Sequence, residues 1–119
     1  MKLTTQSLFE QCYGKYAIAA VNVFTMEQVL GLFSAAHKCQ SPFIVQTTPV
    51  ARNYAHPEML LSMIDAASKI YPDVVYALHL DHGNEDHALA AIASEQYTSV
   101  MIDASHDTVS YTHLRAHET

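Results

Sequence analysis

Four short apolar segments constrain the fold of this chain more than any other feature of its sequence. They lie at residues 17–23, 42–48, 74–80 and 99–104. Apolar residues recur at helical spacing in the intervening stretches, and a further helix is expected at residues 6–13. Strands that are apolar along most of their length and alternate with helices are typical of parallel sheets with helices on their faces. The sequence therefore predicts an α/β fold with a parallel sheet.

Several of the predicted helices have recognisable first residues. Thr25, with Gln28 three positions later, forms the pattern of a capping box at the start of a helix. Pro57 suits the first position of the next helix, and Asn84 is a suitable N-cap for the one after that. Residues 49–55 are expected to form a loop between the second strand and the helix that begins at Pro57.

The third apolar segment helps to choose between an open doubly wound sheet and a (β/α)8 barrel. With the period of two that strands have, Val75, Ala77, His79 and Asp81 share one face, which becomes polar only towards its C-terminal end. The other strands also end in polar residues, namely Asn22, then Thr47 and Thr48, then Asp103 and Ser105. Polar strand ends that meet at one rim are typical of a barrel mouth. We therefore expect the N-terminal half of a (β/α)8 TIM barrel, made of four β–α units. The first strand is not followed by the motif Gly-x-Gly-x-x-Gly, which weakens the alternative of a dinucleotide-binding sheet.

The strongest candidate site is formed by His79, Asp81 and His82 at the end of the third strand. Neutral imidazole is a common zinc ligand, and a carboxylate beside a metal-bound oxygen is well placed to move a proton. We expect Gly83 to free the backbone so that the ring of His82 also turns into the mouth. Alternatively, these are polar residues satisfied within a loop. Asp103 lies in an apolar strand, where an unpaired carboxylate is costly, so it must meet a cation, a donor or a metal.

The other candidate residues each have a structural alternative. Asn22 and Thr48 stand at strand ends, where an amide can form a turn and a hydroxyl can cap one. His37, His56 and His87 fall on predicted helices or loops and are expected to be solvated.

Composition excludes several classes of partner. The net charge is −6, with 6 basic residues against 12 acidic ones, which disfavours nucleic acid and anionic membranes. Cys12 and Cys39 have no metal-binding spacing and form no disulfide framework, which favours a reducing compartment. The sequence begins without an apolar signal region and has no run long enough to span a bilayer. We therefore expect a soluble cytoplasmic protein.

Two motifs in this chain resemble the class II fructose-bisphosphate aldolases, a family of zinc-dependent (β/α)8 barrels. The first is AxHLDHG at residues 77–83, and the second is TSVMIDASH at residues 98–106. The resemblance extends over residues 16–107 and includes AIAAVNV, SPFIVQTT and ARNYAH. It implies reversible cleavage of fructose 1,6-bisphosphate to dihydroxyacetone phosphate and glyceraldehyde 3-phosphate by a homo-oligomeric enzyme. A tagatose-bisphosphate aldolase and a non-catalytic half-barrel module are the alternatives.

The resemblance also implies a role for each candidate residue. Asp81 matches the catalytic acid/base, and His82 matches the first ligand of one catalytic Zn²⁺ ion. Asn22 matches a substrate-contacting asparagine, and Thr48 stands where the family commonly has a phosphate-contacting serine. The remaining residues, expected near the metal or in contact with its ligands, are His79, Asp103 and Ser105. The zinc ion would polarise the ketose carbonyl, so no Schiff-base lysine is required.

Other parts of the family's active site are expected beyond the fourth strand, including two zinc histidines and the glycine-rich phosphate loops. We therefore assign residues 1–108 to the N-terminal part of an aldolase barrel and expect this segment alone to be inactive. Residues 109–119, VSYTHLRAHET, resemble the translation of a transposon-based sequencing adapter and are expected to lie outside the fold. His113 and His117 are for this reason not assigned to a metal.

Overall fold

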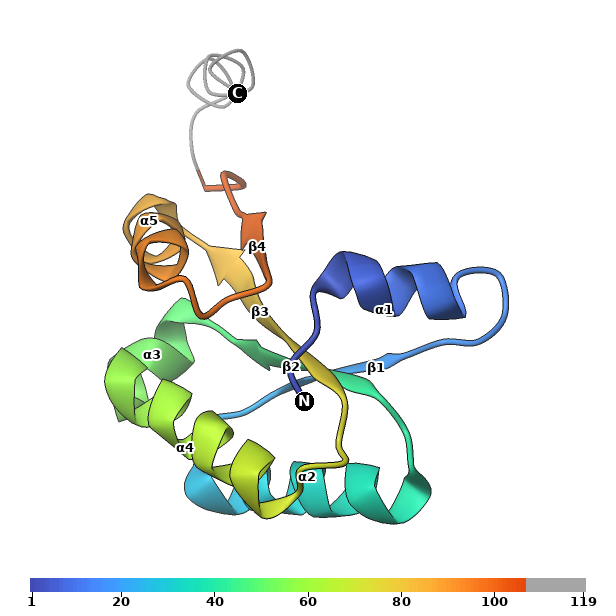
Figure 1. Ribbon diagram of the computed structural model, residues 1–119. Helices are drawn as coiled ribbons and strands as arrows, with labels where there is room; N and C mark the ends of the chain where they lie inside the picture. The colour runs from blue at the N-terminus through green and yellow to red at the C-terminus, as the bar shows by residue number, and fades with distance from the viewer. Residues whose placement is uncertain (107–119) are drawn as a thin grey trace.

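The computed structural model describes residues 1–106 and has a four-stranded parallel sheet in the order β1-β2-β3-β4 (Figure 1). The strands are β1 (Ala19–Asn22), β2 (Phe43–Thr47), β3 (Tyr76–Gly83) and β4 (Ser99–Ile102). The helices are α1 (Thr5–Cys12), α2 (Met26–Cys39), α3 (Pro49–Ala55), α4 (Pro57–Ile70) and α5 (Glu85–Ser94). The predicted parallel α/β sheet is confirmed. None of the helices within residues 1–106 combines the length and hydropathy needed to cross a membrane.

The prediction of a loop at residues 49–55 was wrong, because this segment forms α3. Thr48 is its N-cap, and the Thr48 side chain accepts a hydrogen bond from the backbone N–H of Ala51 at 3.1 Å. Pro49 occupies the first turn, where its missing N–H is not needed. The helix ends at His56, which has a positive φ of 75° and whose side chain then caps α4. The predicted caps at Thr25 and Asn84 are confirmed.

Helices α2 to α5 lie along one side of the sheet, and α1 lies on the other (Figure 1). On the first side, Phe33 of α2 is fully buried, and its ring centroid lies 5.2 Å from that of Phe43 and 5.1 Å from that of Tyr76. Both pairs meet edge-to-face, an arrangement that aromatic rings favour. Ile64 of α4 and Leu78 of β3 belong to the same buried cluster. This cluster attaches α2 and α4 to the two central strands.

The opposite side of the sheet changes from apolar to polar along the strands. Ala20, Ile44 and Ala77 are in register on β1, β2 and β3, and Leu8 of α1 packs against Ile44 and Ala77. Two residues further on, every strand contributes a polar residue to one row, namely Asn22, Gln46, His79 and Ser99. The predicted alternation of faces along the third strand is therefore confirmed. Its polar end lies at the carboxyl edge of the sheet.

The pairing between β3 and β4 is interrupted by a β-bulge. Leu80 pairs with Val100 and Gly83 pairs with Ile102, so Asp81 and His82 of β3 together oppose only one residue of β4. An extra residue on one strand breaks the alternation of side chains and can re-aim them. His82 takes up the change with a φ of 51°, an uncommon conformation for a residue that has a Cβ.

Gly83 has a different role from the one expected. The left-handed residue of the bulge is His82, and the requirement at Gly83 is for space. A Cβ added at Gly83 would lie 2.7 Å from Leu80 Cδ2 and 3.0 Å from the carbonyl oxygen of Met101. Because the second of these neighbours is backbone, it cannot move aside without disturbing the pairing of β4.

We predict that Gly83→Ala destabilises the full-length protein that carries this segment by about 1–3 kcal/mol, the usual cost of overpacking. The matched control is Gly31→Ala in α2, where a new Cβ meets nothing within 4 Å. Since alanine favours helix over glycine, the control should stabilise by about 0.5–1 kcal/mol. Urea unfolding of both variants measures the difference. Equal stability of the Gly83→Ala variant and the wild type would contradict the tight packing at the bulge.

Candidate active site

The bulge brings Asp81 and His82 of β3 close to Asp103, which follows β4. The Nδ1 atom of His82 lies 3.0 Å from Asp103 Oδ2, and its Nε2 atom lies 3.9 Å from Asp81 Oδ1. The imidazole is therefore held between two carboxylates that come from adjacent strand ends. About 59% of the His82 side chain is exposed, so a ligand can approach it from solvent.

Asp103 is itself fixed by the turn that follows it. The backbone N–H of Ser105 donates to Asp103 Oδ1 at 3.0 Å. Hydrogen bonds from the Ser105 hydroxyl and N–H, together with the one from His82, hold the pKa of Asp103 far below its ordinary value. Asp103 consequently stays a carboxylate and accepts a hydrogen bond from the N–H at Nδ1 of His82. The expectation that Asp103 lies within a strand was wrong, because β4 ends at Ile102, but the carboxylate does have the hydrogen-bond donors that were expected for it.

Both carboxylates raise the pKa of His82. Its hydrogen bond to Asp103, and then the negative charge of Asp81, raise the pKa of His82 above 6.5. When the ring is neutral and Nδ1 carries the proton, Nε2 carries the lone pair and lies on the side of Asp81. A histidine whose second nitrogen is bonded to a carboxylate is a common arrangement around metal ligands.

Asp81 has a partner that the sequence reasoning missed. Gln46 Nε2 donates to Asp81 Oδ2 at 3.3 Å, which leaves Oδ1 on the side of His82. Gln46 was not a candidate because it lies inside an apolar strand. Its period-two position in β2 was the available signal, since that position places it in the same row as His79.

His79 precedes Asp81 and His82 on β3, and hydrogen bonds through Ser99 connect it to α1. Its Nδ1 atom is 2.7 Å from the hydroxyl of Ser99, and Thr5 of α1 donates to the same hydroxyl at 2.9 Å. Burial lowers the pKa of His79, and the charge of Asp81 opposes this shift. A neutral, hydrogen-bonded His79 fits a residue that supports the site from beneath.

The other candidates lie further from the pair. Asn22 is the exposed last residue of β1, and Thr48 caps α3. Within residues 1–106, neither of them hydrogen-bonds to Asp81 or His82. The expectation that His87 is solvated was wrong, because its ring is partly buried and accepts a hydrogen bond from Arg52 at 3.0 Å.

Within the described segment, no three side chains of the metal-binding types converge closely enough to hold an ion. The residues present fit a zinc ion only as a partial donor set. His82 offers one imidazole nitrogen, and Asp81 offers a carboxylate beside it. Catalytic zinc sites usually have three protein ligands. Further ligands would have to come from outside residues 1–106.

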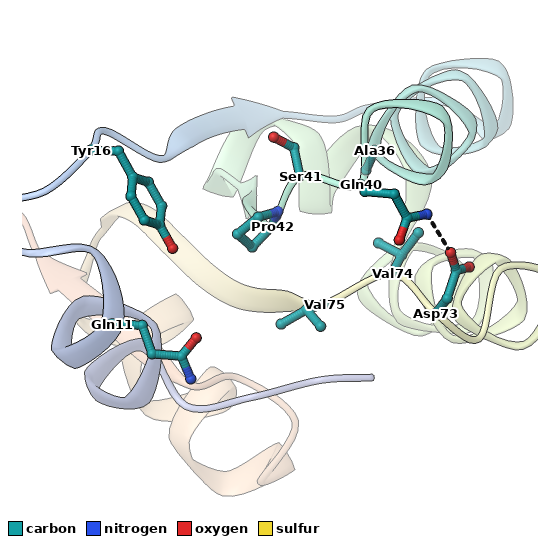
Figure 2. A pocket seen from close by; sticks show the side chains of 9 residues that line it. All are labelled: Gln11, Tyr16, Ala36, Gln40, Ser41, Pro42, Asp73, Val74 and Val75. Carbon is teal, nitrogen blue, oxygen red and sulfur yellow. Dashed lines mark hydrogen bonds between the residues drawn. The ribbon is translucent and has the colours of Figure 1, made fainter.

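A separate hollow of about 250 Å³ lies at the amino-terminal end of the strands (Figure 2). It is lined in part by Tyr16, Gln40 and Asp73. The Asp73 carboxylate accepts hydrogen bonds from Gln40 Nε2 at 2.8 Å and lies 2.9 Å from His37 Nδ1. These contacts tie the end of α2 to the loop before β3, which is a stabilising role that this end of a barrel commonly has.

A parallel sheet whose carboxyl edge is polar has the arrangement found in part of an α/β barrel. Residues 3–114 match the model of the family described as Fructose-bisphosphate aldolase class-II, and the chain belongs to this family. Its fold is shared with the YdjI aldolase from Escherichia coli K12, with a TM-score of 0.77 and 24% identity over 91% of this chain and 42% of that one. The described residues thus contain three complete β–α units and the fourth strand of the N-terminal half of such a barrel.

Two curated relatives give the same family. The chain is 40% identical to fructose-bisphosphate aldolase 2 of Cereibacter sphaeroides over 76% of its own length and 25% of the relative. It is 35% identical to the fructose-bisphosphate aldolase of Sinorhizobium medicae over 87% of its length and 29% of the relative. The chain therefore spans between a quarter and a third of the length of these relatives.

We predict that His82 titrates above pH 6.5 in the metal-free full-length protein and that Asp103→Asn lowers its pKa. Because the pKa of His82 is raised in the folded state, the interaction of the protonated ring with Asp103 and Asp81 stabilises the fold. This stabilisation is fully present below pH 6.5 and is lost as the pH rises through the pKa of the folded state. NMR titration of the imidazole measures both values. Asp65→Asn, which removes an exposed carboxylate on α4, is the matched control and should leave His82 unchanged. An unaltered His82 titration in the Asp103→Asn variant would refute the pairing.

Proposed function

We propose that this chain supplies the acid/base and the first metal ligand of a zinc-dependent aldolase that cleaves fructose 1,6-bisphosphate. The observation that carries the proposal is the bulge in β3, which sets Asp81 Oδ1 3.9 Å from Nε2 of His82. Membership of the class II family supports the sugar bisphosphate as substrate. Tagatose bisphosphate is the near alternative, because it differs from fructose bisphosphate only in configuration at one carbon.

His82 is the residue that would hold zinc, through Nε2. Asp103 bonds to Nδ1 and so fixes both the tautomer and the orientation of the ring, while Ser105 fixes Asp103. When bound, zinc would supply Lewis-acid polarisation of the ketose carbonyl. The positive charge would also offset the repulsion between Asp81 and Asp103 across the ring.

Asp81 is the residue that moves the proton. In the cleavage direction its carboxylate takes the proton of the C4 hydroxyl as the bond between C3 and C4 breaks, and in condensation it returns that proton to the aldehyde oxygen. Gln46 holds Oδ2 by a hydrogen bond, so that Oδ1 is the oxygen that meets substrate. A fixed carboxylate loses less entropy on reaching the reactive geometry.

Asn22 and Thr48 would bind the substrate at the same rim. Asn22 ends the polar row that contains Gln46 and His79, which places its amide at the carboxyl edge of the sheet. Thr48 Oγ1 accepts the capping hydrogen bond of α3, and a hydroxyl that accepts one bond can still donate another to a phosphate oxygen.

We assign residues 1–108 to this barrel and residues 109–119 to an adapter-derived tail, which lies outside the described residues. The remaining zinc ligands and the phosphate loops would then belong to sequence that this chain does not contain. The intact enzyme would be a cytoplasmic homo-oligomer. A half-barrel that binds or assembles without catalysis is the competing function, and a reading frame that continues into four more β–α units would exclude it.

The test compares Asp81→Ala with His82→Ala in the full-length protein. Asp81→Ala should keep its zinc and lower kcat about 10²–10⁴-fold, since it removes a positioned acid/base. His82→Ala should instead lose zinc, because one ligand is gone. Zinc content by elemental analysis and cleavage of fructose bisphosphate measure the two effects. If Asp81→Ala retained turnover within threefold of wild type while holding zinc, Asp81 would not be the acid/base.

We also predict that the 119-residue chain made alone cleaves no fructose bisphosphate and is not a stable monomer. β1 and β4 are edge strands whose unpaired backbone groups invite association. Val21, Met101 and Ile102 on these strands are exposed. Sedimentation, zinc analysis and the cleavage assay test this directly. A monomer with one bound zinc ion and measurable turnover would contradict it.

A further inference from the structure

A buried arginine lies behind the carboxyl edge of the sheet, on the side covered by helices. Arg52 of α3 is only 4% exposed. Its Nε donates to His87 Nδ1 of α5 at 3.0 Å, and its Nη1 donates to the hydroxyl of Tyr97 at 2.8 Å. The guanidinium carbon also lies 5.5 Å from the centroid of the Tyr97 ring, within the range of a cation–π contact.

Arg52 has no carboxylate partner within the described residues. Its hydrogen-bond acceptors there are an imidazole and a phenol, both neutral. Burial of a cation without an opposite charge is costly, and a nonpolar side chain would avoid that cost. The directional hydrogen bonds of Arg52 instead fix the positions of the two groups that accept them.

His87 has to be neutral to accept this bond. An arginine can only donate, so Nδ1 must carry the lone pair and Nε2 the proton. Burial and then the charge of Arg52 lower the pKa of His87, while the neighbouring Asp86 opposes the shift. The direction of this bond therefore defines the tautomer of His87.

The contacts of Arg52 extend, directly or through one further residue, to the segments next to β2, β3 and β4. Tyr97 also bonds to Thr47 Oγ1 at 2.7 Å, and Thr47 stands between Gln46, which holds Asp81, and Thr48. His87 lies in the first turn of α5, whose cap Asn84 directly follows the bulge. Tyr97 precedes β4, which leads to Asp103. Through His87 and Tyr97, the guanidinium is thus linked to the helix that follows β3, to the loop before β4 and to the end of β2.

We infer that Arg52 is a positioning residue, which fixes the strand ends so that Asp81, His82 and Thr48 keep their relative places. This inference rests on the proposed aldolase function. Arg52 acts from the helix-covered side and does not touch the substrate. Loss of its bonds would allow α3 and α5 to move independently, and with them the two loops that carry the acid/base and the hydroxyl.

The test is made on the full-length enzyme with Arg52→Met, which keeps an unbranched apolar stem and removes the guanidinium with its donors. We expect zinc content to stay at the wild-type level while kcat/KM for fructose bisphosphate falls about 10- to 100-fold, because small misplacements are costly in catalysis. The control is Lys69→Met, which removes an exposed cation on α4 and should leave kcat/KM unchanged. Assays at 25 °C on protein shown to be folded by circular dichroism separate this loss from unfolding.

Two variants of His87, which accepts the hydrogen bond of Arg52, provide the rescue test. Their results do not depend on whether Arg52→Met folds. His87→Asn keeps an acceptor near the place of Nδ1 and should retain kcat/KM within about threefold. His87→Leu keeps the volume, removes the acceptor and should match the loss seen for Arg52→Met. A purely structural role would lower the melting temperature of the Leu variant and leave its kcat intact.

The outcomes distinguish this inference from the function on which it rests. An active wild type with a fully active His87→Leu or Arg52→Met variant overturns the positioning role alone. A wild type that holds zinc and cleaves no ketose bisphosphate overturns the proposed function, and the inference with it. A loss in both variants, with recovery in His87→Asn, supports the positioning role.

Discussion

The bulge between Leu80 and Gly83 is the constraint on which the rest of the site depends. In a regular strand Asp81 and His82 would point to opposite faces, and only one of them would reach the mouth. Two residues of β3 opposing one of β4 remove that alternation, and the positive φ of His82 provides the extra turn. Strain of this kind persists only where the surroundings enforce it. Here they do so through the tight packing of Gly83 against Leu80 and Met101.

The rest of the sheet explains why the polar groups gather at one end. Parallel strands in register place equivalent positions side by side, so one apolar row is followed two residues later by one polar row. α1 covers the apolar row through Leu8 and, through Thr5, bonds to the polar one at Ser99. The same helix therefore closes one end of the sheet and supports His79. The site above this row is left open to solvent.

Much of the fold could be predicted from the sequence, because its signals are local. Helical spacing, the caps at Thr25 and Asn84 and the period of two in the third strand each involve a few neighbouring residues. The prediction failed at residues 49–55, where a capping threonine and a proline start a helix too short to show an apolar stripe. The bulge was missed as well, since register is a property of two strands. Gln46 and Arg52 went unnoticed because their partners are distant in sequence: Asp81 and His87 lie 35 positions after Gln46 and Arg52, respectively.

Residues on both faces of the sheet stabilise the candidate site, in different ways. On the inner face, short hydrogen-bonded contacts fix individual side chains: Gln46 holds Asp81, and Asp103 holds His82. Such contacts orient individual side chains. On the helix-covered face, Arg52 links α3 to α5 and to the approach to β4, and it adds to the backbone pairing that already joins β2, β3 and β4. A mobile side chain on a fixed strand can be oriented by a single hydrogen bond, whereas a displaced strand carries every residue on it out of place. The inferred positioning role of Arg52 is therefore complementary to these hydrogen bonds: it limits displacement of the strand ends, and they orient the side chains that those ends carry.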